Sequence, residues 1–130
     1  MRQERVYRTE AIVLREMDYG EADRILTLLT PKGKLSAIAK GVRRPTSRKV
    51  GHLGLFMRAH LMLARGRNLD IITQAETVEP YMGLRTDLQR IAQASYVVEV
   101  LDRFTYEDGQ NVGVFRLLTD TLDRLANQTN

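Results

Sequence analysis

The hydrophobic period of this chain changes at Pro80, and the change divides the sequence into two unlike parts. Before Pro80, apolar and polar residues alternate, most clearly where apolar residues fill every odd position from 53 to 63: Leu53, Leu55, Met57, Ala59, Leu61 and Leu63. A period of two is typical of a half-buried β-strand. After Pro80, apolar residues recur every three or four positions, as on one face of a helix. We therefore predict an α+β chain, with strands over residues 1–80 and helices over residues 81–130.

Four more segments before Pro80 have the composition of strands and are separated by turn residues. They cover residues 7–16, 22–30, 35–42 and 69–76. The turn that contains Pro31 and Gly33 predicts an antiparallel hairpin between the second and third strands. Five antiparallel strands with one long connection, roughly over residues 42–52, favour an OB-type β-barrel with a filled interior. An SH3-like barrel predicts much the same pattern of strands and stays an alternative.

Two amphipathic helices are predicted after Pro80. The apolar face of the first consists of Leu84, Leu88, Ile91, Ser95, Val98 and Leu101. A capping box of Thr86 and Gln89 would start this helix near residue 87, and the turn at residues 107–109 would end it. The second helix follows a cap at Asn111, and its apolar face consists of Phe115, Leu118, Leu122 and Leu125. Because two such helices normally need a third element to cover them, we expect the helical region to be incomplete.

Positive charge is concentrated in the first part of the chain. The net charge is +4. Residues 1–80 hold 15 lysines and arginines against 9 acidic residues, while residues 81–130 hold 5 against 7. The run from 40 to 49 contains no acid and five cations, namely Lys40, Arg43, Arg44, Arg48 and Lys49. With Pro45 inside it, this run predicts a basic loop, which is either a solvated connection or a surface for a polyanion such as nucleic acid.

One aromatic residue is a candidate for stacking on nucleic-acid bases. Phe56 falls on the even, outward face of the predicted 53–63 strand, together with Arg58 and His60. An aromatic ring beside cations on an exposed strand is the arrangement that single-stranded nucleic acid binds. Tyr7 and Tyr19 are predicted to be core or turn residues instead.

The residue types that catalysis and metal binding require are scarce. The chain has no cysteine, which excludes disulfides, thiol nucleophiles and cysteine-ligated zinc. Its two histidines, His52 and His60, lie eight residues apart, which is not a metal-site spacing. We therefore expect neither an enzyme nor a metal or cofactor site. A charged start and the lack of a segment of ~20 apolar residues predict a cytoplasmic protein that does not span a membrane.

Three segments resemble the amino-terminal region of RecO, the bacterial recombination mediator: DYGEADRI at 18–25, GKLSAIAKGVRR at 33–44 and ARGRNLDI at 64–71. Residues 95–111 are similar to the region that follows it in that family. The resemblance implies an OB-fold DNA-binding domain over residues 1–80, joined to a helical region that is incomplete relative to the family. It also implies binding of single- and double-stranded DNA without strong sequence preference, and strand annealing. Further implications are action with RecR in loading RecA onto DNA coated with single-stranded-DNA-binding protein, and a bacterial protein that joins the nucleoid when bound to DNA.

The resemblance also implies which cations contact DNA. In the matching segments and the basic loop these are Lys34, Lys40, Arg43, Arg44 and Arg48, and on charge alone we add Lys49, Arg65 and Arg67. Members of the family are longer, and some carry a four-cysteine zinc site that this chain has no residues to form. The chain is therefore either a fragment or a shortened homologue, and the family's docking site for single-stranded-DNA-binding protein is not expected to be complete.

Three other functions fit the same residues. The chain could be a protein-interaction module that docks RecR and contacts DNA incidentally, which a DNA-blind variant with retained RecR binding would favour. It could bind RNA instead of DNA, since OB surfaces serve both. It could be a small hydrolase, in which case substitution of His52 and His60 would abolish turnover.

Overall fold

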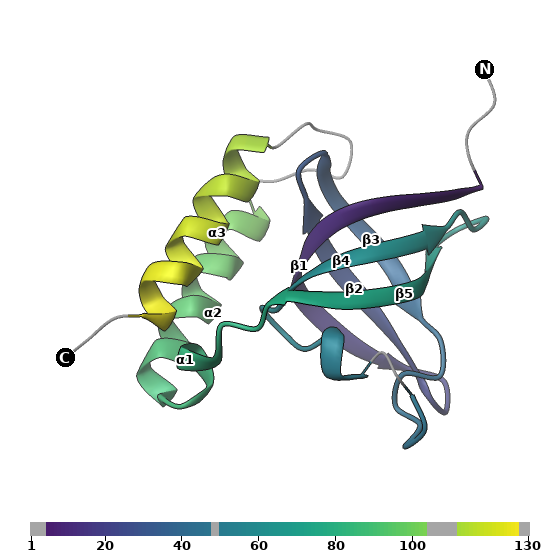
Figure 1. Cartoon of the computed structure of the whole chain (residues 1–130), viewed down its shortest axis with the longest axis horizontal. Helices are drawn as coiled ribbons and strands as arrows, with labels where there is room; N and C mark the ends of the chain where they lie inside the picture. The colour runs from purple at the N-terminus through teal and green to yellow at the C-terminus, as the bar shows by residue number, and fades with distance from the viewer. Residues whose placement is uncertain (1–4, 48–49, 104–111, 128–130) are drawn as a thin grey trace.

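The computed structural model describes residues 5–47, 50–103 and 112–127, and within them five strands form a closed barrel. The strands are β1 (Val6–Tyr19), β2 (Asp23–Thr30), β3 (Gly33–Ala39), β4 (Arg58–Ala64) and β5 (Asp70–Glu79). A short 3₁₀ turn, η1 (Val50–His52), lies in the connection between β3 and β4. The helices α1 (Met82–Arg85), α2 (Leu88–Arg103) and α3 (Val112–Ala126) follow, and α2 and α3 lie side by side along one side of the barrel (Figure 1).

The strand order around the barrel is β1-β2-β3-β5-β4, which brings β4 back beside β1. This Greek-key order confirms the OB-type barrel. The prediction that every pair is antiparallel was wrong at one place, because β3 and β5 are parallel, with Ala37 opposite Asp70. The reason is geometric: strand directions can alternate all the way around a closed ring only if the number of strands is even. A closed barrel of five must contain one parallel pair.

Strand β1 closes the barrel by pairing on both sides. Its first half pairs with β4, from Val6 opposite Ala64 onward, and its second half pairs with β2 as far as Tyr19 opposite Asp23. The register with β2 shifts between Val13 and Arg15, which marks a bulge where the strand bends from one partner to the other.

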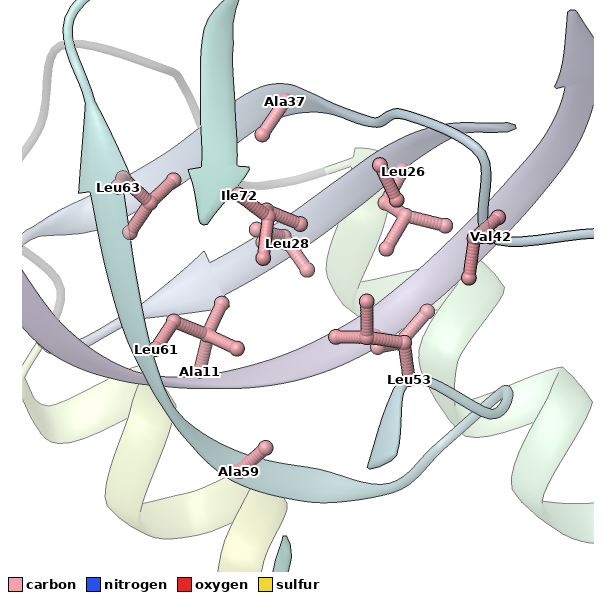
Figure 2. Close-up of a cluster of buried hydrophobic side chains, with 12 residues drawn as sticks. Ala11, Leu26, Leu28, Ala37, Val42, Leu53, Ala59, Leu61, Leu63 and Ile72 are labelled. Atoms are coloured by element: carbon pink, nitrogen blue, oxygen red, sulfur yellow. The ribbon is translucent and has the colours of Figure 1, made fainter. Parts of the chain in front are cut away.

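Buried apolar residues form two separate cores, and β1 is the wall between them. Ala11 and Val13 belong to the core inside the barrel, whereas Ile12 and Leu14 belong to the core between the barrel and the helices, as strand alternation requires. Figure 2 shows the inner core, where Leu28 and Ile72 meet at the centre. The outer core takes Phe115, Leu118 and Leu122 from α3, which confirms the face predicted for that helix.

The alternating segment 53–63 is a strand only from Arg58 onward. Before it, Phe56 adopts a left-handed backbone (φ 64°), and its N–H donates to the carbonyl of Val13 (2.8 Å). The Met57 carbonyl in turn accepts from the N–H of Val13 (3.1 Å). The bulge in β1 thus supplies these bonds and turns the incoming chain, so Leu53 reaches the barrel core from a loop. The sequence pattern thus predicted the burial of Leu53 and Met57 correctly, but it was wrong to predict that residues 53–57 belong to the strand.

Helix α2 begins differently from the prediction. Asp87 caps it, since its Oδ1 accepts from the N–H of Gln89 (2.9 Å), while Thr86 donates to the carbonyl of Gly83 instead. The capping box was therefore wrong, and the short helix α1 was not predicted. On α2 itself Ala94 and Val98 are buried, whereas Leu88 is 84% exposed. The predicted turn at 107–109 and the cap at Asn111 lie outside the described residues.

A charged pair stands at the junction between barrel and helices. Arg58 pairs with Glu10 of β1, and its guanidinium carbon lies 5.9 Å from the centre of the Phe115 ring in α3. This geometry places a cation over an aromatic face and links the two layers.

Tyr81, just after β5, is buried in the outer core. Its hydroxyl has no partner in hydrogen-bond geometry within the described part of the chain. Burial, and next the charge of Asp123, raise the pKa of Tyr81 to about 12, although the nearby Arg58 acts in the opposite direction. The pKa of Asp123 is also raised, because burial and the charge of Glu79 oppose its ionisation.

Candidate nucleic-acid interface

The structure places the predicted DNA-contacting cations at two ends of the barrel. Lys34 lies at the start of β3 and Lys40 just after its end, so six residue steps of ~3.3 Å separate them by ~20 Å. We call the end with Lys40 the loop surface: it comprises the β1–β2 turn and residues 40–47. We call the other end the barrel mouth. It is a cavity of about 230 Å³, and its charged lining consists of Arg8, Lys32, Lys34, Arg65 and Asp70.

Arg43 is the structural support of the loop surface. Its guanidinium donates to the carbonyls of Gly20 (2.6 Å) and Asp23 (3.1 Å) and lies 3.4 Å from the Asp18 carboxylate. A carboxylate oxygen of Asp23 also accepts from the N–H of Gly41 (2.6 Å), where a positive φ of 66° suits glycine. Arg43 thus holds the β3–β4 connection against the β1–β2 turn, and its donors are largely occupied.

Lys40 and Arg44 are the exposed cations of the loop surface. Neither has an ion pair or a side-chain hydrogen bond to any residue that the structure describes. The acidic residues nearby are partly engaged: Asp18 contacts both Arg24 (3.0 Å) and Arg43. Arg48 and Lys49 lie outside the described residues, so their place on this surface stays a prediction.

The predicted outward position of Phe56 was wrong. The residue is 5% exposed and packs in the outer core, because its left-handed backbone directs the ring toward the helices. Tyr19, at the end of β1, is 53% exposed and precedes Gly20, whose carbonyl Arg43 holds. Tyr19 is therefore an exposed aromatic side chain beside the loop surface. Its position directly before the turn at Gly20 agrees with the turn alternative predicted for it from the sequence.

Arg65 of the barrel mouth is held in place by an aromatic ring. The Arg65 guanidinium lies over the Tyr7 ring, 4.4 Å from its centre, and the Tyr7 hydroxyl donates to Asp70 (2.5 Å). Burial, and then the bond to Asp70, raise the pKa of Tyr7 well above its usual value, so the phenol stays protonated. Arg67 is exposed in the β4–β5 turn. Arg8 and Lys32 were not predicted to contact DNA, because both lie outside the acid-free run of cations at residues 40–49.

Lys34 ties the barrel to helix α2. Its ammonium donates to the Asp102 carboxylate (2.9 Å) and to the Asp102 carbonyl (3.1 Å). The other oxygen of that carboxylate pairs with Arg15 (3.1 Å). Lys34 and Asp102 are only 15% and 16% exposed, so this cation is part of the fold. Its predicted contact with DNA is untested.

The two histidines have different surroundings. His52 Nδ1 accepts from the N–H of Thr77 (3.1 Å) and lies 2.7 Å from the Thr77 hydroxyl, which fastens η1 to β5. His60 is exposed on β4. Across the described ranges, no three His, Asp or Glu side chains gather in a way that could hold a metal ion. No helix in those ranges has both the length and the apolar character needed to cross a membrane.

Comparison with known proteins assigns the chain to a family in two adjoining pieces. Residues 1–81 match the family model described as "Recombination protein O N terminal", and residues 85–130 match "Recombination protein O C terminal". The chain is 48% identical over 122 residues to "DNA repair protein RecO" of Roseiflexus sp. (strain RS-1), covering 94% of this chain and 43% of that protein. It is 46% identical over 123 residues to the protein of the same name from Pelotomaculum thermopropionicum, covering 94% and 48%.

A third relative, "DNA repair protein RecO" of Nocardioides sp., is 49% identical over 120 residues, covering 90% of this chain and 49% of that protein. The chain thus spans about half the length of the curated relatives it matches. Because the first family model alone covers more than half of the chain, the chain belongs to the RecO family of DNA repair and recombination proteins.

Proposed function

We propose that this chain binds the backbone of single- and double-stranded DNA without sequence preference, through the loop surface. The observation that carries the proposal is the exposure of Lys40 and Arg44, with no ion pair to a described residue, beside the exposed ring of Tyr19. Cations that neutralise phosphates release condensed counterions, so the affinity should fall steeply as salt rises. A tyrosine ring adds stacking that every base can accept. Arg48 and Lys49 would extend the same surface.

Strand annealing follows from this type of contact. Weak, mobile contacts to phosphates lower the repulsion between two complementary strands and give way once the duplex forms. No bond is made or broken in such a step, so we propose a protein that is not an enzyme and needs no cofactor. In the cytoplasm it would act with RecR to help RecA load onto DNA coated with single-stranded-DNA-binding protein. Membership of the RecO family supports this role.

A second candidate is a module that docks RecR and contacts DNA only incidentally. The exposed apolar side chains Leu88, Tyr96 and Val100 of α2 favour it, because their spacings of eight and four residues place them near one face of the helix. A variant that no longer binds DNA but still binds RecR would support this candidate.

The test of the DNA-binding proposal is a salt titration of binding to a labelled single strand, read by fluorescence anisotropy. Lys40→Ala with Arg44→Ala removes two phosphate contacts and should make the slope of log affinity against log salt shallower by ~1.4. The control is Arg116→Ala with Arg124→Ala, which removes the same charge from the exposed side of α3. Equal slopes for the two double variants would refute the assignment of the loop surface.

A further inference from the structure

The barrel mouth has a larger excess of positive charge than the described part of the loop surface. Among the described residues, its lining has four cations and one acid, Asp70, which accepts from the Tyr7 hydroxyl; the charge of Lys34 is paired with Asp102, which leaves three cations. Of the four, Arg8 and Lys32 are exposed and have no side-chain hydrogen bond or ion pair within the ranges that the structure describes. At the loop surface, by contrast, three acids stand close to the cations in the chain: Asp18, Glu21 and Asp23.

One of the mouth's cations is fixed before any ligand arrives. Arg65 is held over the Tyr7 ring, whereas the charge of Lys34 is already paired with Asp102 and belongs to the fold. An anion that binds beside Arg65 therefore loses little side-chain entropy in ordering this charge. Arg8 and Lys32 add two charges that can move toward the ligand.

The size of the cavity limits what it can hold. At about 230 Å³ it lies below the ~300–1,000 Å³ typical of pockets for small organic ligands. It is open to solvent on one side, where an extended chain can pass across it. A phosphate group of a longer polyanion fits this combination of a small basic hollow and an open rim.

The geometry points to a second site for a nucleic-acid backbone at the barrel mouth, so that one chain holds two strands at once. This inference rests on the proposed function and extends it. The strand β3 separates the mouth from the loop surface by ~20 Å, so a short strand bound at one end leaves the other end open. Two strands held on one barrel are close enough to find each other without a second protein molecule.

The experiment uses the full chain and two identical oligothymidylates of about six nucleotides, near the low end of the site size of one OB barrel. One carries a fluorescence donor and the other an acceptor, and their sequence prevents pairing between them. Energy transfer then reports two strands on one protein particle. Sedimentation velocity of the same samples gives the number of protein chains and strands in that particle.

The wild type should bind two strands per single chain and give energy transfer. The variant Arg8→Ala with Lys32→Ala should bind one strand, lose the transfer, and lose ~1.4 from the summed salt slope. The variant Lys40→Ala with Arg44→Ala should also lose the transfer, whereas Arg116→Ala with Arg124→Ala should keep it. Thermal melting confirms that each variant is folded, which is expected because the substituted side chains are exposed.

Other outcomes overturn the inference. A single strand per wild-type chain, or transfer that occurs only in particles with two protein chains, would refute a second site on one barrel. Undiminished transfer in the Arg8/Lys32 variant would remove the mouth from the site. A wild type that binds no strand at all would instead refute the proposed function itself, so the two failures are distinguishable.

Discussion

Replacement of Lys34 by methionine tests whether this lysine belongs to the fold or to the DNA surface. Methionine keeps the length and apolar stem of the side chain but removes the ammonium that donates to the Asp102 carboxylate (2.9 Å) and carbonyl (3.1 Å). The carboxylate keeps its contact with Arg15, so it does not become an isolated buried charge.

The expected magnitude lies between two limits. Exposed ion pairs contribute ~0–1 kcal/mol, and removing one partner of a fully buried pair costs ~3–5 kcal/mol. Lys34 and Asp102 are 15% and 16% exposed, which places them nearer the buried limit, while Arg15 reduces the loss. We therefore expect Lys34→Met to lower the free energy of unfolding by ~2 kcal/mol. Asp102→Ala leaves both cations without their carboxylate and should cost more, ~3 kcal/mol.

The assay is urea denaturation of the wild type, both single variants and the double variant, followed by circular dichroism. The double-mutant cycle should give a coupling energy of ~1–2 kcal/mol, since each single change already removes the pair. The salt slope of DNA binding should stay the same in the folded Lys34→Met protein. A change below ~0.5 kcal/mol, the usual range for surface substitutions, together with a shallower salt slope, would refute this reasoning and return Lys34 to the DNA surface.

Three further predictions test the outer core and the aromatic residues. Because the pKa of Tyr81 is about 12 in the folded protein and ~10 in the unfolded chain, wild-type stability should fall as pH rises above 10. Tyr81→Phe should remove the part of this loss of stability that comes from the phenol, as measured by urea denaturation at pH 9–11. At pH 7 it should raise the free energy of unfolding by ~1 kcal/mol, because a buried hydroxyl without a partner is removed. An unchanged dependence of stability on pH would contradict this. Ionisation of Asp123, whose pKa is also raised, should reduce stability as pH rises through the carboxyl range. Asp123→Asn should therefore be more stable than the wild type at pH 7, with a gain that disappears near pH 3 in thermal melts, and equal stability at pH 7 would contradict the assigned cause. Phe56→Ala should lower the free energy of unfolding by ~3–5 kcal/mol and leave the DNA affinity unchanged. Tyr19→Ala should weaken binding to single strands by ~1–3 kcal/mol and leave the free energy of unfolding unchanged. The reverse pattern in thermal melts and anisotropy titrations would restore Phe56 as the stacking residue.

The elements predicted well from sequence are those whose evidence is local. Pro31 and Gly33 indicated the β2–β3 hairpin because turn chemistry acts within a few residues. The face of α3 was visible because Phe115, Leu118 and Leu122 repeat with the helical period. On α2 the same reasoning was wrong at Leu88, which is exposed. The helix instead buries the small residue Ala94, which allows close packing against its neighbours.

The site was less predictable because it depends on long-range geometry. Nothing near Phe56 in the sequence reveals that a bulge some forty positions earlier, beside Val13, supplies its backbone bonds. Lys34 and Lys40 look like one basic cluster in the sequence, and only the intervening strand puts them at opposite ends of the barrel. The parallel pair of β3 and β5 could have been inferred from the odd number of strands once closure was assumed.

Strand β1 carries a residue of each basic surface, with Arg8 near its start and Tyr19 at its end. The spacing between the two surfaces is therefore set largely by the length of a continuous backbone. Substitutions in either core leave that length unchanged. An insertion of two residues in β1 would lengthen it by ~7 Å and keep the inward and outward positions in phase. An insertion of one would exchange the two cores' side chains. The distance between the two surfaces can therefore change mainly through insertions or deletions of two residues at a time.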